Sequence, residues 1–157
     1  MKKEILSESR TETVAIGKRL GESFRGGEVV ALVGELGSGK TTFAKGIAQG
    51  LGISRRVPVT SPSFVLLREY QGKKLPLYHV DAYRLTRPGD LLRLEQEIGL
   101  EDYLYGRGVS VLEWADRLEE LLPEEYLRVE FFYVDPARRR LSLHPVGKRY
   151  KNLVRVL

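Results

Sequence analysis

The sequence contains no cysteine and only two histidines, His79 and His144. Disulfide bonds, thiolate metal sites and cysteine nucleophiles are therefore excluded, and two histidines are too few for a dedicated zinc site. No apolar run approaches the about 18 residues that a membrane-spanning helix needs. The first residues, 1–8, lack the apolar core of a secretory signal peptide. We therefore expect a cytoplasmic protein with no membrane segment.

The composition is that of a globular protein, with 42% hydrophobic and 30% charged residues. Its 157 residues predict a single domain spanning residues 1–157, because the length suffices for one core and is short for two. The formal net charge is +5, and the run Arg138, Arg139 and Arg140 concentrates positive charge. Such a balance favours nucleic acid or acidic partners, although a charge run is more often a solvated face.

The chain matches the phosphate-binding pattern G-x-x-x-x-G-K-[ST] without mismatch at residues 34–41. The apolar run 29–33 precedes the pattern and predicts a strand that is buried on both faces of a parallel sheet. Residues 42–48 follow it with apolar side chains one helical turn apart. The order of strand, glycine loop and helix favours a phosphate-binding loop over a plain tight turn.

Each residue type in this loop answers a chemical demand of a bound nucleoside triphosphate. Glycines allow positive φ and leave backbone N–H groups open to an oxyanion, which the start of the helix also attracts. Lys40 can reach the β- and γ-phosphates, and the Thr41 hydroxyl can bind the accompanying Mg²⁺. The predicted nucleotide contacts in the loop are Glu35, Leu36, Gly37, Ser38, Gly39, Lys40, Thr41 and Thr42.

Two acidic residues follow predicted strands elsewhere in the chain. Asp81 comes after the strand candidate 75–80, and Glu113 comes after the apolar run 109–112. Ligands of open α/β sheets bind at the carboxyl ends of the strands, so both carboxylates are candidates for Mg²⁺ or a water on it. A lone Asp in this position is more often a turn or cap residue. The assignment of Asp81 to the site therefore depends on the glycine loop.

The N-terminal part predicts an amphipathic helix that begins with a capping box at residues 9–12 and stops at Gly26 and Gly27. Thr11 lies at the start of this helix, where it could come near a nucleotide base. Residues 57–63 hold two prolines and three hydroxyl residues and predict an extended loop. This loop is either a nucleotide-sensing switch or, as we prefer from composition alone, a plain connection.

The remaining segments complete an α/β fold of the P-loop NTPase type. We expect a central, mostly parallel sheet with antiparallel additions, flanked by helices. Pro76 indicates an edge or an irregularity in its strand. Two hairpins are predicted, one pairing residues 64–70 with 75–80 and one pairing residues 126–134 with 139–144. Helices are predicted at residues 90–97 and 115–122, with a further short turn at 99–104.

A phosphate loop with nearby carboxylates supports phosphoryl transfer, and three functions remain open. The first is a small-molecule or nucleoside kinase, for which Arg84, Arg87 and Arg93 could form a lid. The second is a switch ATPase, and the third is a non-catalytic nucleotide-gated binding module. Asn152 is the only asparagine, so the chain has no Asn-Lys-x-Asp motif for guanine. Adenine is thus favoured by elimination.

Four segments in order resemble the signatures of the TsaE (YjeE) family: residues 34–42, Thr-Ser-Pro-Ser-Phe at 60–64, Tyr-His-Val-Asp-Ala-Tyr-Arg-Leu at 78–85 and Leu-Glu-Trp at 112–114. The resemblance implies a small bacterial ATPase that is needed to make threonylcarbamoyladenosine in tRNA. It further implies ATP and Mg²⁺ as cofactors and TsaD and TsaB as partner proteins. A complete nucleotide site without an evident small acceptor pocket leads to the hypothesis that the protein alone hydrolyses ATP weakly.

The same resemblance implies roles for individual residues. Thr41 and Glu113 are similar to the magnesium ligands, Lys40 to the phosphate-binding lysine and Asp81 to the acid of the second switch. Thr11 matches the position near the base only loosely. The chain departs from the family at Ser38, where Ala is frequent, and at Ser63, where a second Thr is frequent; both keep size or hydroxyl chemistry. Residues after Trp114 match no signature, which leaves open whether Arg138 to Arg140 contact tRNA, a partner or only water.

Overall fold

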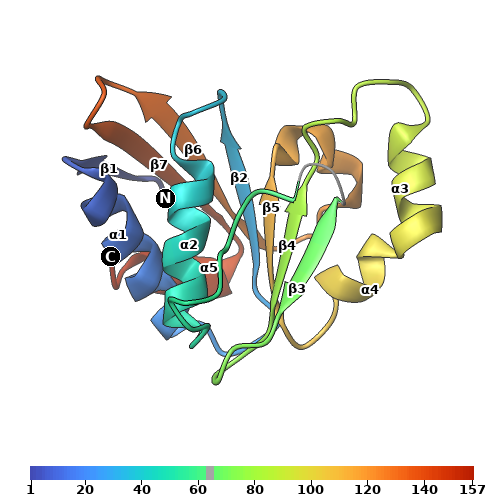
Figure 1. Cartoon of the computed structure of the whole chain (residues 1–157), viewed down its shortest axis with the longest axis horizontal. Helices are drawn as coiled ribbons and strands as arrows, with labels where there is room; N and C mark the ends of the chain where they lie inside the picture. The colour runs from blue at the N-terminus through green and yellow to red at the C-terminus, as the bar shows by residue number, and fades with distance from the viewer. Residues whose placement is uncertain (63–65) are drawn as a thin grey trace.

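The strand that leads into the glycine loop, β2 (Val29–Gly34), lies in the middle of the sheet (Figure 1). The computed structural model describes residues 1–62 and 66–157, and within them the strands form one seven-stranded sheet. Residues Val29 to Leu32 are all buried, as expected for a strand covered on both faces. Three strands run parallel to β2: β4 (Leu77–Asp81), β5 (Val109–Glu113) and β6 (Tyr126–Tyr133).

Antiparallel strands extend the sheet on both sides. β3 (Leu67–Tyr70) pairs with β4, β7 (Arg139–Val146) pairs with β6, and β1 (Lys3–Ser7) pairs with β7. The resulting strand order is β1-β7-β6-β2-β5-β4-β3. The predicted α/β architecture, with a parallel centre and antiparallel additions, is confirmed.

Helices cover both faces of this sheet, which gives three layers (Figure 1). Val30 and Leu32 of β2 belong to the core on one face, and Val29 and Ala31 belong to the core on the other. The first face carries α1 (Arg10–Ser23), α2 (Lys40–Gly50) and α5 (Lys148–Val154), and the second carries α3 (Asp90–Ile98), α4 (Leu100–Leu104) and the 3₁₀ turns η1 (Ala115–Arg117) and η2 (Glu119–Leu121). No helix among the described residues combines the length and apolar character that crossing a membrane requires.

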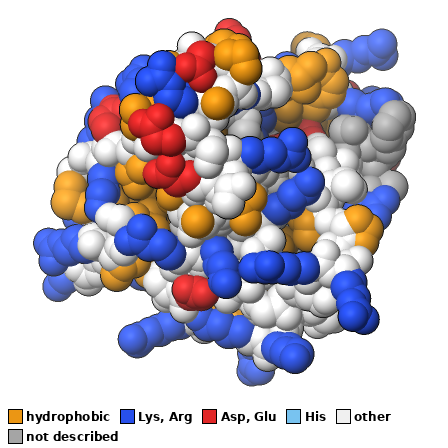
Figure 2. Space-filling model, turned by 60° about the vertical axis from the view of Figure 1, so that its left-hand side comes forward, with side chains coloured by type: hydrophobic (Ala, Val, Ile, Leu, Met, Phe, Trp, Pro, Cys, Tyr) orange, Lys and Arg blue, Asp and Glu red, His pale blue; other side chains and the backbone are white. Residues whose placement is uncertain are grey.

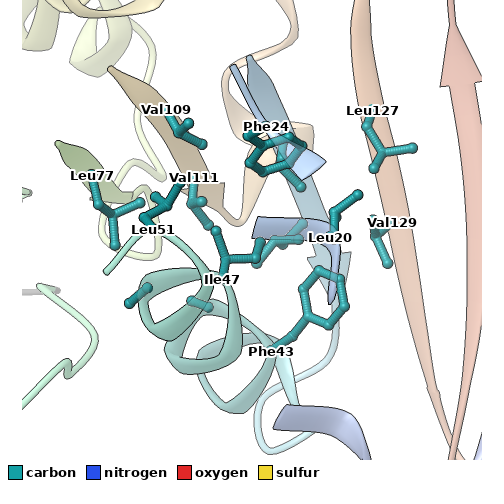
Figure 3. Packing of buried hydrophobic residues seen from close by; sticks show 14 of the residues in the cluster. Leu20, Phe24, Phe43, Ile47, Leu51, Leu77, Val109, Val111, Leu127 and Val129 are labelled. Atoms are coloured by element: carbon teal, nitrogen blue, oxygen red, sulfur yellow. The ribbon is translucent and has the colours of Figure 1, made fainter. Parts of the chain in front are cut away.

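One core fills the space between the sheet and the pair formed by α1 and α2 (Figure 3). Leu20 of α1 and Phe24, directly after α1, enter it from one side, and Phe43 and Ile47 of α2 enter it beside them. The rings of Phe43 and Phe131 meet edge to face with their centroids 5.5 Å apart. The apolar spacing that predicts both helices thus also identifies the faces that they bury.

Glycines allow α1 and α2 to approach each other closely. A Cβ added at Gly17 would lie 2.4 Å from the carbonyl oxygen of Phe43, and one added at Gly46 would lie 2.2 Å from that of Val14. Backbone therefore packs directly on backbone along this contact. Because α2 begins at the glycine loop, its packing on α1 holds the start of α2 in place below the carboxyl ends of the parallel strands.

The C-terminal helix α5 is absent from our sequence-based prediction, whose last element is the strand at residues 139–144. It starts after Gly147 without a side-chain cap, and Tyr150 and Val154 are its buried residues. The backbone N–H of Val29 donates to the Tyr150 hydroxyl at 2.8 Å, and burial raises the pKa of this hydroxyl. The helix is thus stabilised by contacts distant in sequence, which a local pattern does not reveal. Strand β1 was missed for the same reason.

The predicted start of the first helix is confirmed, whereas its end is not. Ser9 Oγ accepts a hydrogen bond from the Glu12 backbone N–H at 3.1 Å. The helix ends at Ser23 rather than at Gly26 and Gly27, because Phe24 takes an extended backbone conformation. The predicted helix 115–122 is instead two 3₁₀ turns that are separated by the buried Leu118.

The first predicted hairpin is confirmed by the antiparallel pairing of Tyr70 with Leu77. Its first strand begins at Leu67, and residues 64 and 65 of the predicted strand lie outside the described residues. Of the two alternatives that Pro76 indicates, the edge strand is wrong, because β4 lies between β3 and β5. Pro76 precedes β4, and its carbonyl accepts a hydrogen bond from the Val109 N–H at 2.9 Å. Because Pro76 contacts β5 through its carbonyl oxygen, the N–H group that it lacks removes no hydrogen bond between β4 and β5.

We expect Gly17→Ala to destabilise the protein. Alanine gains about 1 kcal/mol in helix propensity, but its methyl group meets backbone that cannot move away alone. The net loss in the free energy of unfolding should be about 1–3 kcal/mol, measured by urea denaturation. Glu22→Ala, a change at an exposed position of the same helix, serves as the control. An unchanged or higher midpoint for Gly17→Ala would contradict the close helix contact.

Candidate functional site

A cavity of about 470 Å³ lies at the carboxyl ends of the parallel strands, next to the start of α2. The register of the sheet pairs Asp81 of β4 with Glu113 of β5, and Glu113 in turn with Leu32 of β2. The two acids and the glycine loop therefore meet at one edge of the sheet, as the rule for open α/β sheets predicts. The β6–β7 turn and the first turn of α1 close the cavity from the other side.

The glycine loop has the backbone geometry that its sequence predicts. Gly37 and Gly39 have φ angles of 76° and 107°, in the region that side chains disfavour. A Cβ added at Gly34 would lie only 2.6 Å from Ser38 Oγ, so a side chain at this position would collide with Ser38 unless Ser38 moved. Gly39 occupies the N-cap of α2, and no side chain among the described residues caps this helix. The first N–H groups of α2 are therefore available to an anion in the cavity.

Lys40 is a buried cation at the floor of the cavity, with a relative exposure of 4%. Its Nζ donates to the carbonyl oxygens of Gly34 at 2.5 Å and Glu35 at 2.8 Å, and it lies 4.3 Å from the centroid of the Trp114 ring. Burial lowers the pKa of the Lys40 ammonium, and the nearby carboxylates, Glu113 first, oppose this shift. An anion at this position would complete the compensation of its charge.

A hydrogen-bonded chain connects α2 with two neighbouring strands. Thr41 Oγ1 donates to Glu113 Oε1 at 2.8 Å, and His79 Nε2 lies 2.6 Å from Glu113 Oε2. An ionised carboxylate only accepts, so His79 donates through Nε2. His79 is fully buried, and its Nδ1 has no partner among the described residues. Both oxygens of Glu113 are thereby oriented, one of them toward Thr41.

Asp81 connects the two segments that resemble family switches. Its Oδ2 accepts a hydrogen bond from the Ser61 hydroxyl, and its Oδ1 accepts one from the Tyr83 backbone N–H at 2.8 Å. Asp81 is buried and lines the cavity. A carboxylate fixed in this way can hold a water or a cation at a defined position.

The oxygen ligands of the cavity fit Mg²⁺ bound together with phosphates. Among the described residues no group of three or more His, Cys, Asp or Glu side chains could hold a metal ion by itself. Thr41 and Glu113 offer one hydroxyl and one carboxylate, and Mg²⁺ takes few protein ligands and fills the rest with water and phosphate oxygens.

The structure brings most of the predicted residues together. The cavity is lined by Leu36, Gly37, Ser38, Gly39, Lys40, Thr41, Thr42, Asp81 and Glu113. Thr11 and Glu35 are not among its lining residues. Thr11 is exposed on α1, and its neighbours Arg10 and Thr13 line the cavity from the adjacent helical face. Glu35 takes part through its backbone carbonyl, which accepts from Lys40. That Thr11 binds the base stays a prediction.

The three arginines of the basic run have separate surroundings. Arg139 lines the cavity, and its Nη2 donates to the Gly37 carbonyl oxygen of the glycine loop at 3.2 Å. Arg138 pairs with Asp135 at 2.6 Å, and the guanidinium of Arg140 lies 4.2 Å from the Phe132 ring centroid. The place of Arg139 is not predictable from the sequence alone, because its contact with the loop depends on where the paired strands β6 and β7 bring it.

Positive charge is also spread widely outside this run. Figure 2 shows Lys and Arg side chains over much of the face that carries α1, with Asp and Glu in smaller groups. A general attraction to polyanions therefore does not single out residues 138–140, and their contact with tRNA stays a prediction.

Comparison with known proteins identifies the family. The model of the family described as "Threonylcarbamoyl adenosine biosynthesis protein TsaE" matches residues 7–141. The chain belongs to the TsaE family. TsaE of Bacillus subtilis (strain 168) is 42% identical over 142 residues, covering 90% of this chain and 85% of that protein. TsaE of Nostoc sp. (strain PCC 7120) is 35% identical over 151 residues, covering 96% and 91%.

A solved structure supports the same assignment. The crystal structure of Bacillus subtilis YdiB superposes with a TM-score of 0.82 at 37% identity, covering 99% of this chain and 93% of that one. The resemblance to the TsaE family and the predicted fold class are thus confirmed. The family is involved in the biosynthesis of threonylcarbamoyladenosine in tRNA.

We expect the buried pair of His79 and Glu113 to be energetically coupled. His79→Ala and Glu113→Ala each leave a buried polar partner unsatisfied and should each lower the free energy of unfolding by about 2–4 kcal/mol. The double variant should lose less than the sum, by about 1–3 kcal/mol. Guanidinium denaturation of the four proteins measures this difference. Strict additivity would show that the two side chains do not hold each other.

Proposed function

We propose that this member of the TsaE family is a cytoplasmic, magnesium-dependent ATPase that acts with TsaD and TsaB in the modification of tRNA. The observation that carries the proposal is the buried Lys40 beside an uncapped helix start, with Thr41 and Glu113 hydrogen-bonded within the same cavity. This set of groups meets the demands of phosphoryl transfer, which are positioning and neutralisation of charge.

Each residue has a role that follows from its position. The N–H groups of the glycine loop and of the first turn of α2 bind phosphate oxygens, and Lys40 adds a point charge beside them. Thr41 and Glu113 supply oxygen ligands for Mg²⁺, and His79 orients Glu113 from behind. Bound MgATP supplies the transferable phosphoryl group and the cation that offsets its charge. We assign Asp81 to the attacking water, which a fixed carboxylate can orient.

The two other functions are separated by one assay series. Phosphate release from ATP is measured with the protein alone, then with TsaD and TsaB, then with tRNA added. We expect slow release by the protein alone and faster release with its partners. Rapid phosphorylation of a small metabolite without partners would replace the proposal with a kinase. Tight ATP binding with no release under any condition would indicate a nucleotide-gated binding module.

Lys40→Ala should weaken ATP binding by about 10- to 150-fold, because a charge-assisted contact is worth about 1.5–3 kcal/mol. Titration calorimetry with a non-hydrolysable ATP analogue measures this loss. Lys151→Ala removes an equal charge from an exposed position on α5 and should bind like the unchanged protein. Equal ATP affinity of Lys40→Ala and the unchanged protein would show that Lys40 does not contribute to ATP binding.

Glu113→Ala should weaken the binding of Mg²⁺ more than it weakens the binding of the nucleotide. We expect the Mg²⁺ concentration for half-maximal hydrolysis to rise at least about tenfold, because an oriented ligand is lost, whereas nucleotide affinity without Mg²⁺ changes little. Glu120→Ala, an exposed acid on η2, is the matched control. If hydrolysis by Glu113→Ala and by Glu120→Ala depended on Mg²⁺ in the same way, Glu113 would not be a Mg²⁺ ligand and would only be the last residue of a strand.

A further inference from the structure

A second hollow of about 500 Å³ lies beside the nucleotide cavity, between the segment after β4, the start of α3 and η1. Four arginines line it: Arg84, Arg87, Arg93 and Arg117. Apart from the kinase lid that the sequence leaves open for Arg84, Arg87 and Arg93, no function considered for this protein uses this surface. A gathering of guanidinium groups around one hollow is suited to carboxylate or phosphate groups, which arginine binds with two parallel hydrogen bonds.

The hollow is cationic despite one acid in its wall. Asp90 accepts hydrogen bonds from the backbone N–H groups of Thr86 at 3.0 Å and Arg87 at 2.8 Å, and its side chain is only 12% exposed. Its carboxylate therefore holds the turn before α3. Arg93 lies 4.0 Å from Asp90, but its side chain is 68% exposed. A pair this long and this exposed leaves Arg93 available to a stronger anionic partner.

The hollow is connected to the nucleotide cavity by direct contacts. Tyr83 lines both hollows, and its backbone N–H donates to Asp81. The Arg117 guanidinium donates to the Tyr83 carbonyl oxygen and lies 4.8 Å from the centroid of the Trp114 ring. That ring in turn lies 4.3 Å from Lys40 Nζ. A molecule in the hollow would therefore contact residues that also border the nucleotide.

The surroundings of the hollow favour a protein over RNA. Two of the elements that carry it also bear exposed acids, Glu97 on α3 and Asp116 on η1. A nucleic-acid backbone carries closely spaced negative charges, which carboxylates on the same elements disfavour. A protein segment can instead place acidic side chains on the arginines and basic ones on the rim.

Two exposed apolar side chains support the same choice. Tyr83 is 43% exposed in the wall of the hollow, and Leu92 is 64% exposed on α3. Figure 1 shows α3 at one side of the molecule, beyond the strands β3 and β4. Tyr and Arg are among the residue types that contribute most to the binding energy of protein–protein interfaces, where contacts of smaller weight surround them. A hollow lined by Tyr83 and arginines is therefore suited to a protein partner.

We propose that this arginine-lined hollow docks an acidic segment of a protein partner next to the nucleotide cavity. The proposal rests on the proposed function for the partner itself, and it specifies where that partner binds and through which chemistry. Arg87 and Arg93 provide its most accessible charges, whereas Arg117 also supports Trp114.

The test compares Arg87→Glu and Arg93→Glu with Arg56→Glu, an equal charge reversal at an exposed residue in the loop after α2. The buried residues of that loop, Ile53 and Val59, belong to the core on the opposite face of the sheet. Purified TsaD and TsaB together are the probe, and affinity is measured by surface plasmon resonance with MgATP at two salt concentrations. Nucleotide affinity of each isolated variant is measured by titration calorimetry, and tRNA binding by gel shift.

We expect Arg87→Glu and Arg93→Glu each to weaken partner binding at least about tenfold and to reduce its salt dependence, because like charges then meet. Arg56→Glu should bind within about twofold of the unchanged protein. All three variants should keep their nucleotide affinity, which also shows that they are folded. Arg87→Lys, which keeps the charge, should bind more tightly than Arg87→Glu.

Unchanged partner affinity in both Arg87→Glu and Arg93→Glu would overturn the proposal. A loss of tRNA binding in these variants with intact partner binding would assign the hollow to RNA instead. Failure of the unchanged protein to bind MgATP would defeat the proposed function separately, because nucleotide affinity is measured on the isolated proteins in an assay of its own.

Discussion

The ammonium group of Lys40 is buried at the base of a glycine loop, and much of the surrounding structure compensates for that charge. Two loop carbonyls accept its hydrogen bonds, an indole ring lies against it, and the carboxylates of Asp81 and Glu113 oppose the loss of its proton. A buried cation is costly unless it is paired and hydrogen-bonded. Placing such a cation where helix N–H groups are also unpaired creates a strong preference for an anion with several oxygens.

The scaffold holds the groups around this cation in a fixed arrangement. Parallel pairing of β4 with β5 sets Asp81 beside Glu113, and the buried His79 behind Glu113 orients its carboxylate toward Thr41. Thr41 is itself positioned by α2, which packs backbone to backbone on α1 through glycines such as Gly17. Site geometry therefore depends on packing well away from the cavity, which is how a rigid core supports a precise site.

The residues predictable from sequence are those that act within a local pattern. The loop around Lys40 matches a motif whose chemistry is contained in consecutive residues, and Asp81 and Glu113 directly follow apolar strands whose ends share one edge of the sheet. Arg139 could not be predicted, because it reaches the loop through the register of a distant hairpin. Thr11 lies on α1 outside the lining of the cavity, because the direction of a helical side chain depends on how the helix packs, and its contact with the base stays a prediction. Short elements such as α5 depend on tertiary contacts and leave little local signal.

The measurement that tests the central claim most directly is a crystal structure of the protein with a non-hydrolysable ATP analogue and Mg²⁺. Our account predicts that the N–H groups of residues 37–42 and Lys40 Nζ contact the phosphates, with Thr41 and Glu113 bound to the cation. A structure in which the triphosphate lies outside this loop, or in which Glu113 turns away from the cation, would contradict it.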